Sequence, residues 1–355
     1  MQLAFTEAYL AIGTSRPNPA VGAVLVKNGR IVGRGRTQKP GSHHAEIMAL
    51  NEAGTEADGA DMYVTLEPCC HWGRTPPCAD AILKAKVARV FVALIDENPR
   101  VNGGGVVRLR DGGVLVEVGL CGDEATEFYR GFFYHMRTGL PWVDVKIAQS
   151  LDGFIAGPQG ERTQITGAVT GEWVHRLRAR VDAIVIGGGT AIHDDPQLTV
   201  RSVPGNNPMR IILNGTSQLP ASLLLFHDGE AATLVYSRVP QNALSAAEQQ
   251  LWPSEVFADA WLSLLKQLGD LGFHRILLES GARMAGLMLP DIRLWNRFLL
   301  LTASKLLGRG LPWSRDLPDD WNHSLHLSRF ERIDCDFLVE FDHVYRNNSS
   351  SRNHS

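Results

Sequence analysis

Residues 65–78 read TLEPCCHWGRTPPC, and residues 44–46 read HAE. In both stretches a metal-binding side chain stands at an expected corner between a strand and a helix. One imidazole and two thiolates satisfy three positions of a tetrahedral zinc ion and leave the fourth for water. We therefore predict a zinc site formed by His44, Cys69 and Cys78, in a layered α/β fold that supplies such corners.

Glu46 is the candidate proton carrier of this site. Its carboxylate comes two residues after a ligand and is not itself needed as a ligand. Zinc lowers the pKa of a bound water, so Glu46 could take the water proton and give it to a departing amine. His-x-Glu combined with Pro-Cys indicates a zinc-dependent hydrolytic deaminase. The alternative is a structural zinc site, with Cys70 or His71 as the fourth ligand.

Composition narrows the possible functions. The 355 residues are 44% hydrophobic and carry a net charge of −3. The chain therefore lacks the excess of positive charge that is typical of nucleic-acid-binding proteins. No apolar run is long enough to span a membrane, and the N-terminus is unlike a secretory signal. Five cysteines, three of them in residues 69–78, indicate a metal site in a reducing compartment. We expect a cytoplasmic protein that binds neither nucleic acid nor membranes.

The apolar pattern predicts two α/β domains. Residues 1–140 alternate helices and strands, with a hairpin turn at Asn28-Gly29. Residues 141–345 repeat the alternation, and residues 346–355 are polar, which predicts a disordered tail. The expected strands are 20–26, 30–35, 62–66, 89–94, 142–148, 183–186, 210–213, 233–236, 275–278, 297–302, 325–332 and 337–341, and the expected helices include 44–53, 78–86, 171–180 and 258–271.

Three motifs of the first half resemble one enzyme family. Pro17-Asn18-Pro19-Ala20-Val21-Gly22 precedes the zinc ligands, Asp96-Glu97-Asn98-Pro99 follows them, and a long spacer with Thr-Pro-Pro separates Cys69 from Cys78. Over nearly its whole length the chain is similar to the bifunctional riboflavin-biosynthesis deaminase/reductases. This resemblance implies a cytidine-deaminase-like three-layer α/β/α domain at the N-terminus. The substrate contacts that it implies there are Asn18, Arg74, Asp96 and Asn98.

The second half has two corners where an apolar strand runs into glycine. They lie at Ile184–Thr190 and Glu279–Ala282, where free backbone amides could approach a phosphate, although each could also be a tight turn. The resemblance implies a dihydrofolate-reductase-like α/β domain here, with NADPH as its cofactor. The implied NADPH contacts are Ala148, Gln164, Thr190, Asp194, Gly281, Ala282, Arg283, Met284, Ala285, Gly286 and Leu287. The implied contacts to the ribosyl phosphate are Arg162, Arg178, Leu198, Arg201 and Glu279.

The chain departs from the family pattern at several positions, among them residues 37, 162, 164 and 214. Thr37 stands where a histidine is usual, and Asn214 replaces an aspartate. Arg162 replaces a small hydroxyl residue and could add a phosphate contact or obstruct the site. Gln164 replaces a tryptophan, which removes a flat apolar wall for the nicotinamide. These changes keep open the alternative of a working deaminase with a reductase-like domain that has lost its activity.

The sequence thus predicts a two-step enzyme for a small pyrimidine ribotide. The zinc domain would deaminate 2,5-diamino-6-(5-phosphoribosylamino)pyrimidin-4-one, and the second domain would reduce the ribosyl group to a ribityl chain with NADPH. We also expect a homo-oligomer, as in the family. Two other functions are possible from the sequence. A polynucleotide base deaminase would need a basic or aromatic platform that binds a nucleic-acid strand. In a zinc-stabilised binding module, Glu46 would have no role.

Overall fold

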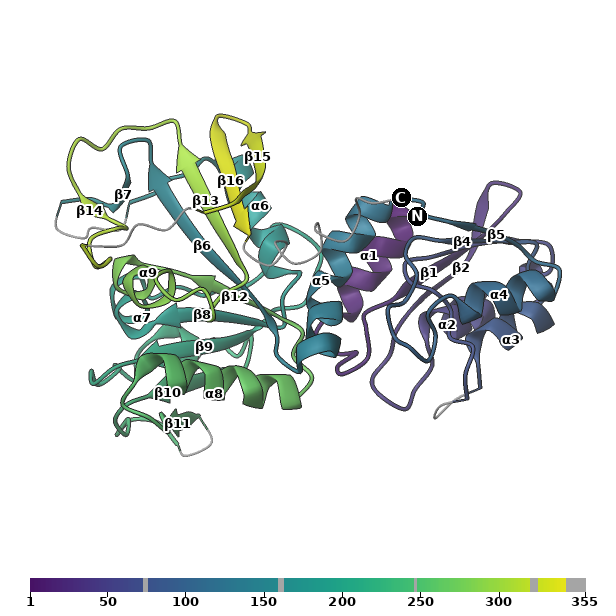
Figure 1. Cartoon of the computed structure of the whole chain (residues 1–355), viewed down its shortest axis with the longest axis horizontal. Coiled ribbons are helices and arrows are strands. Elements are labelled where there is room, and N and C mark those ends of the chain that lie inside the picture. Colours follow the sequence, from purple (N-terminus) through teal and green to yellow (C-terminus); the bar gives the residue numbers. More distant parts are fainter. Residues whose placement is uncertain (73–75, 159–162, 246–247, 320–324, 343–355) are drawn as a thin grey trace, which may run out of the picture. The chain divides into compact units, whose positions relative to one another are not determined.

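The chain, described from a computed structural model, forms two compact units (Figure 1). The structure describes residues 1–72, 76–158, 163–245, 248–319 and 325–342. The first unit contains residues 1–140 with the short segments 204–206 and 268–274, and the second contains the other residues from 141 on. Arg74, Arg162 and the tail 346–355 lie outside the described residues. Each unit contains a β-sheet that is packed against α-helices, so the predicted α/β class is confirmed.

The first unit has a five-stranded sheet in the order β2-β1-β3-β4-β5. Its first two strands form the predicted antiparallel hairpin, and the turn residues Asn28 and Gly29 both have positive φ, as a tight hairpin turn requires. Its strands are β1 (Gly22–Lys27), β2 (Arg30–Arg36), β3 (Asp61–Val64), β4 (Arg89–Val92) and β5 (Leu115–Val118). Its α-helices are α1 (Gln2–Ala11), α2 (Ala45–Ala53), α3 (Cys78–Lys84), α4 (Gly104–Asp111) and α5 (Gly122–Thr138).

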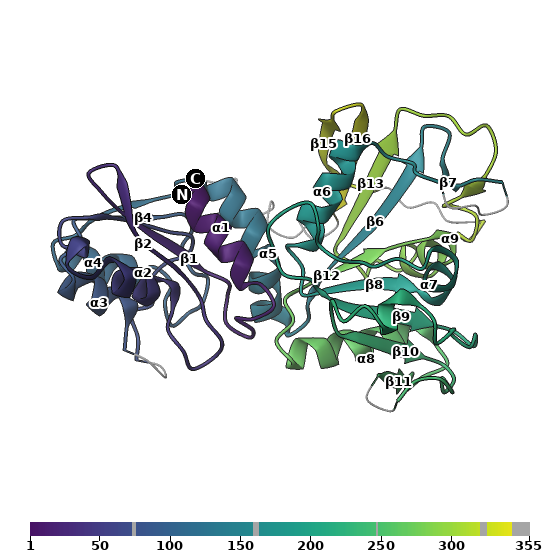
Figure 2. The same ribbon diagram turned by 180° about the vertical axis from the view of Figure 1, so that it is seen from behind.

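Helices cover both faces of this sheet. Figures 1 and 2 show α1 and α5 on one face and α2, α3 and α4 on the other, which gives three layers. Helix α2 lies close to β2 because Gly35 has no side chain: a Cβ there would overlap the carbonyl oxygen of Ala45. The small residues Ala45, Ala49 and Ala53 of α2 are buried. Because His44 immediately precedes α2, this close packing also fixes the position of His44.

The second unit has a nine-stranded sheet in the order β11-β10-β9-β8-β12-β6-β13-β16-β15. Neighbouring strands run parallel except at β16, which is antiparallel to both β13 and β15. The strands are β6 (Trp142–Ser150), β8 (Ala183–Gly187), β9 (Met209–Asn214), β10 (Thr233–Ser237), β11 (Gln249–Leu251), β12 (Arg275–Glu279), β13 (Arg297–Ala303), β15 (Leu327–Ile333) and β16 (Asp336–Asp342). A separate two-stranded sheet pairs β7 (Phe154–Ala156) with β14 (Leu311–Pro312). The α-helices are α6 (Ala168–Arg178), α7 (Gly188–Asp194), α8 (Phe257–Asp270) and α9 (Ala282–Met288).

One element differs in kind from the sequence-based expectation. The glycine run after β8, for which the sequence left open a phosphate-binding corner or a tight turn, forms the short helix α7, although glycine is a poor helix former. Gly188 is suited to this position because Asn214 Oδ1 occupies the space that a Cβ would need. The short strands β7, β11 and β14 were not predicted, since two or three residues carry no readable periodicity. Among the described residues, no helix combines the length and apolarity needed to cross a membrane.

Candidate functional site

Three potential metal ligands converge in the first unit. His44 immediately precedes α2, Cys78 opens α3, and Cys69 lies on the segment between β3 and α3. The Nδ1 atom of His44 is 3.7 Å from Cys69 Sγ and 3.3 Å from Cys78 Sγ. Tetrahedral zinc with ordinary bond lengths would separate a nitrogen and a sulfur ligand by about 3.6 Å. The donor set and its spacing therefore fit zinc, with one position left for water.

The thiolate form that zinc requires is favoured at Cys69. Hydrogen bonding from the Cys78 thiol, assisted by His44, lowers the pKa of Cys69 to about 4. The backbone N–H of Cys78 also donates to Cys69 Sγ at 3.3 Å. Within the described part of the chain, only His44, Cys69 and Cys78 form such a ligand group. Cys70 instead donates to the carbonyl oxygen of Arg100, so it does not act as a fourth ligand here.

Glu46 stands beside these ligands in the first turn of α2. Only 3% of its surface is exposed. Burial, and then the negative charge of Cys69, raises the pKa of Glu46 to about 7. A carboxyl group with such a pKa can both accept and release a proton near neutral pH, which is what general acid–base catalysis requires.

A cavity of about 360 Å³ adjoins this group. His44, Glu46 and Cys69 line it together with Asn18, Asp96 and Asn98. These side chains come from segments that are distant in sequence, and they surround a space large enough for a heterocycle. The cavity thus brings together two of the three predicted zinc ligands, the predicted proton carrier and three of the four predicted substrate contacts. The fourth, Arg74, lies outside the described residues.

The two glycine corners of the second unit lie side by side. Strands β8 and β12 are parallel neighbours, so their carboxyl ends meet at one edge of the sheet, where α/β proteins usually bind ligands. A Cβ on Gly281 would be 3.5 Å from Thr190 Oγ1, and one on Gly187 would be 3.1 Å from Met284 Cγ. A Cβ on Gly189 would meet nothing within 4 Å. The backbone is therefore accessible at a corner where a cofactor phosphate would fit.

The predicted cofactor residues lie on several elements of the second unit. Thr190 and Asp194 lie in α7, and residues 281–287 form the start and body of α9. Ala148 lies on β6, which pairs with β12. Gln164 is outside the helices and strands; its side chain donates to the carbonyl oxygen of Thr166 at 3.0 Å. The predicted cofactor residues of α7 and α9 are therefore brought together.

The predicted substrate residues of the second unit form a charged group. Arg178 donates to both carboxylate oxygens of Glu279, at 2.7 and 3.0 Å, and Lys146 lies 3.6 Å from the same carboxylate. Burial alone would raise the pKa of Glu279, but Arg178 and Lys146 lower it to about 2. Glu279 is therefore a permanent anion that already neutralises Arg178.

Arg201 lies close to this ion pair. Its backbone N–H donates to His175 Nδ1 at 3.3 Å. Burial, and after it the charges of Arg178 and Arg201, lowers the pKa of His175. Leu198, also predicted to touch the substrate, is 2% exposed and has φ of +54°, a strained conformation for a bulky residue. Arg162 lies outside the described residues.

Comparisons with known proteins identify the family. The RibD C-terminal domain model matches residues 141–339, and the cytidine and deoxycytidylate deaminase zinc-binding region matches residues 1–94. Riboflavin biosynthesis protein RibD of Aquifex aeolicus is 40% identical over 313 residues, which cover 88% of each chain. The chain belongs to the RibD family. The RibD protein of Escherichia coli is 39% identical over 318 residues, or 84% of this chain and 86% of that one.

Solved RibD structures have the same two-part architecture. Acinetobacter baumannii RibD superposes with a TM-score of 0.72 at 34% identity, covering 96% of this chain and 97% of that one. A Thermotoga maritima protein, named diaminohydroxyphosphoribosylaminopyrimidine deaminase/5-amino-6-(5-phosphoribosylamino)uracil reductase, gives a TM-score of 0.78 at 31% identity with the same coverage. The expected resemblance to the riboflavin-biosynthesis deaminase/reductases is confirmed, with a deaminase zinc-binding domain followed by a reductase domain.

Two departures from the RibD pattern have a structural explanation. Thr37 lines the deaminase cavity, and its Oγ1 accepts a hydrogen bond from Val21 N at 3.0 Å, so this side chain supports the backbone that follows Asn18. Asn214 donates from Nδ2 to Ser217 O at 2.7 Å and to Ser237 Oγ at 3.0 Å. An aspartate could make neither of these donations, so the surroundings of Asn214 suit an amide.

Glu67 is a functional candidate that the sequence analysis missed. Its carboxylate is 4% exposed and lines the cavity. It accepts hydrogen bonds from four backbone N–H groups, those of Asp96, Gly103, Gly105 and Val106, at 2.8–3.2 Å. Glu67 therefore attaches the loop that carries Asp96 and Asn98 to the segment that carries Cys69. The signal in the sequence was an acidic residue directly after the predicted apolar strand 62–66, where apolar residues are usual.

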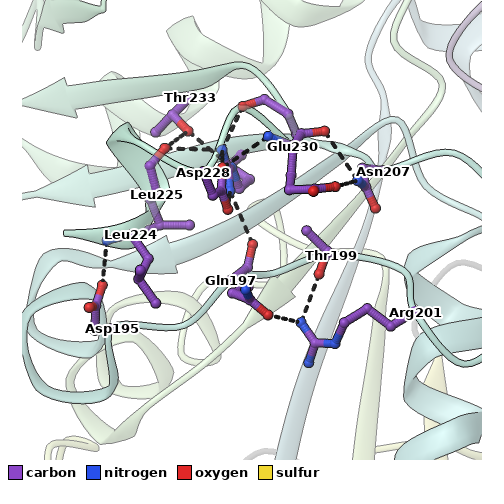
Figure 3. A network of polar contacts seen from close by, with 12 residues as sticks. Asp195, Gln197, Thr199, Arg201, Asn207, Leu224, Leu225, Asp228, Glu230 and Thr233 are labelled. Carbon is purple, nitrogen blue, oxygen red and sulfur yellow. Dashed lines mark hydrogen bonds and ion pairs between the residues drawn. The ribbon is translucent and has the colours of Figure 1, made fainter.

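A second missed residue supports the reductase side. Arg210 is 1% exposed and donates to both carboxylate oxygens of Asp228, at 2.7 and 2.8 Å. Its Nη1 also donates to Gln197 O at 3.2 Å, and Figure 3 shows the Asp195–Arg201 segment beside this network. Arg210 thus holds the backbone of the segment that contains Leu198 and Arg201. A lone arginine in an apolar strand was the sequence signal.

Proposed function

We propose that the chain catalyses two steps of riboflavin biosynthesis. It would deaminate 2,5-diamino-6-(5-phosphoribosylamino)pyrimidin-4-one and then reduce 5-amino-6-(5-phosphoribosylamino)uracil with NADPH. The observation that carries the proposal is a cavity lined by two of the predicted zinc ligands, by a buried carboxyl whose pKa is raised to about 7, and by the amide and carboxylate groups of Asn18, Asp96 and Asn98. The name of the similar Thermotoga maritima protein supports the choice of substrates.

In the deaminase step, this chain's residues bind the pyrimidine and move one proton. Zinc held by His44, Cys69 and Cys78 would supply a nucleophilic water at neutral pH. A carboxylate oxygen of Glu46 would take one proton from the attacking water and give it to the departing amine, so that one water is consumed and one ammonia is released. Asn18 can donate to and accept from the heterocycle edge, while Asp96 can accept from an amino group.

In the reductase step, the residues position two molecules and complement their charges. NADPH would supply a hydride to C1′ of the ribosyl group. The backbone at the exposed Gly189 and at the half-buried Gly281 would hold the cofactor. Arg201, together with the Arg178–Glu279 pair, would hold the ribosyl phosphate. Hydride transfer needs orientation more than a protein nucleophile. Of the changes that motivated the alternative of an inactive reductase domain, Asn214 has surroundings that suit an amide.

Three finer features belong to the same proposal. A cytoplasmic location would keep the ligand thiols Cys69 and Cys78 reduced. We also propose a homo-oligomer, in keeping with the family resemblance. The substrate would be a free ribotide rather than a nucleic acid, because the chain has a net charge of −3.

The proposal is tested by assaying each step separately on the full chain. Ammonia release is measured with the diamino ribotide, and loss of NADPH absorbance is measured with the uracil ribotide supplied directly. We expect both activities in the wild type. In Glu46→Gln, deamination should fall by about 10²–10⁴-fold because the proton carrier is lost, while NADPH oxidation is retained. Absence of NADPH oxidation in the wild type would restrict the function to deamination, and an unchanged ammonia rate in E46Q would remove Glu46 from the mechanism.

A further inference from the structure

Arg201 carries a charge that no carboxylate neutralises within the described ranges. Its Nη1 donates to Gln197 Oε1 at 2.6 Å and to Thr199 Oγ1 at 2.7 Å, and both acceptors are neutral. Figure 3 shows the Gln197 and Thr199 side chains reaching the same end of the guanidinium. Arg178 differs from Arg201, because its guanidinium donates to both oxygens of the negatively charged Glu279 carboxylate. Glu279 is paired with both Arg178 and Lys146. Arg201 has only neutral acceptors among the described residues, so the charge of Arg201 is available to a ligand.

The two arginines are joined through a single residue. Thr199 accepts from Arg201 through its hydroxyl and from Arg178 Nη1 through its carbonyl oxygen, at 3.3 Å. Thr199 is 3% exposed, so its position is fixed by packing. An anion that contacts Arg201 would consequently lie near the Arg178–Glu279 pair, where the ribosyl group is expected.

Gln197 is held firmly although its side chain is exposed. Its carbonyl oxygen accepts from Arg210, and the next residue, Leu198, is buried in a left-handed conformation. The Asp228 carboxylate, two backbone carbonyl oxygens and the Thr233 hydroxyl occupy the other donors of Arg210. The Gln197 backbone thus has little freedom, and its amide oxygen is presented to Arg201 from a fixed point.

We propose that Gln197 is a positioning residue that sets the selectivity of the reductase site for a phosphate group. Its amide oxygen orients the Arg201 guanidinium but adds no charge, so the full positive charge remains for the phosphate dianion. A carboxylate at this position would pair with Arg201 and compete with the substrate. This inference rests on the proposed reductase function, because that function supplies the phosphorylated substrate.

The first test compares Gln197→Glu and Gln197→Leu with the wild type in full-length protein. NADPH oxidation is followed with the uracil ribotide and with its dephosphorylated ribosylamino form. In Q197E, we expect KM for the ribotide to rise about tenfold or more, with kcat within about twofold and little change for the dephosphorylated compound. Q197L keeps the charge of Arg201 but loses its orientation, so a smaller rise of about threefold is expected.

Gln267→Glu is the matched control. Gln267 lies on α8 and accepts from Gln250 Nε2 at 2.7 Å, a bond that a glutamate can also accept. The variant adds the same negative charge without touching Arg201, so its KM should match the wild type. Ammonia release by the same preparations reports whether the chain is folded. An unchanged KM in Q197E, or an equal rise in Q267E, would overturn the proposal.

Direct binding separates this inference from the proposed function. Ribose 5-phosphate and ribose are titrated calorimetrically into the wild type and Q197E. The proposal expects the wild type to bind the phosphate compound at least about tenfold more tightly than Q197E does, and ribose equally weakly in both. This result would support the role of Gln197 even if NADPH oxidation failed. Equal binding of ribose 5-phosphate by both proteins, including no binding by either, would reject it.

Discussion

Glu67 connects the metal-binding segment to the loop that completes the cavity. A single carboxylate that accepts four backbone N–H groups is a strong and directional anchor, since each oxygen receives two donors. Two of these donors, Gly105 N and Val106 N, belong to the first turn of α4, where backbone N–H groups have no partner within the helix. The anchor therefore satisfies the helix start and fixes Asp96 and Asn98 at the same time.

We predict that Glu67→Gln weakens both the fold and substrate binding. The amide has one acceptor oxygen, and its NH₂ group would face two N–H donors, which leaves buried groups unpaired at about 1–3 kcal/mol each. The melting temperature should fall and KM for the diamino ribotide should rise, while zinc content is retained. Differential scanning calorimetry, steady-state kinetics and metal analysis measure these three quantities.

Glu97→Gln serves as the control, because Glu97 lies in the same loop but is exposed and pairs with Arg137. We expect E97Q to resemble the wild type. If E67Q had wild-type KM and melting temperature, Glu67 would have no anchoring role.

At this scale the sequence predicts what depends on residue type and spacing. His44, Cys69 and Cys78 meet as expected because their chemistry restricts them to few roles, and Glu46 is buried beside them. Glu67 and Gln197 could not be assigned in this way. Their roles depend on partners that folding brings close, and a glutamate or glutamine alone does not reveal its partners.

Helix α2 is the element that brings the ligands and the proton carrier into position. It starts directly after His44, and Glu46 lies in its first turn. Its close packing on β2 depends on the absence of a side chain at Gly35. The order of strands and helices follows from periodicity, and each predicted strand is present, with ends that differ by a few residues. The short helix α7 was missed because its glycines favour a turn, and only the contact between Gly188 and Asn214 accounts for it.

We predict that Gly35→Ala moves α2 and impairs zinc binding. The new Cβ would overlap the Ala45 carbonyl oxygen, and such overpacking typically destabilises a protein by about 1–3 kcal/mol. Zinc content per chain and the rate of ammonia release should both fall. Gly171→Ala on α6, where a Cβ meets nothing within 4 Å, should leave both unchanged. Full zinc occupancy in G35A would contradict the importance of this contact.

On the scale of the whole molecule, each unit has its own sheet and hydrophobic core. The core of the first unit includes Leu25, Met62 and Val90, and that of the second includes Ile184, Leu277 and Leu299. The proposed zinc ligands all belong to the first unit, and the predicted cofactor residues all belong to the second. The sequence predicts this division because alternating helix and strand patterns occur on both sides of residues 139–141.

We predict that removing zinc affects only the first activity. A strong chelator should abolish ammonia release and lower the unfolding temperature of the first unit, since a bound metal stabilises the state that binds it. NADPH oxidation with the uracil ribotide should stay within about twofold of the untreated protein. Calorimetry with both assays, before and after zinc is restored, measures this. A parallel loss of both activities would show that the second site also depends on the metal.

The separate sheets have a genetic consequence. Two alleles that each inactivate a different half, such as E46Q and Arg201→Ala, should complement one another when they are expressed in the same cell. The R201A protein would carry out the deamination, and the E46Q protein would reduce the deaminated ribotide. Complementation therefore requires that this ribotide diffuses from one molecule to the other. Riboflavin auxotrophy in such a strain would instead reveal that the intermediate is passed on within one molecule or assembly and never reaches the solvent.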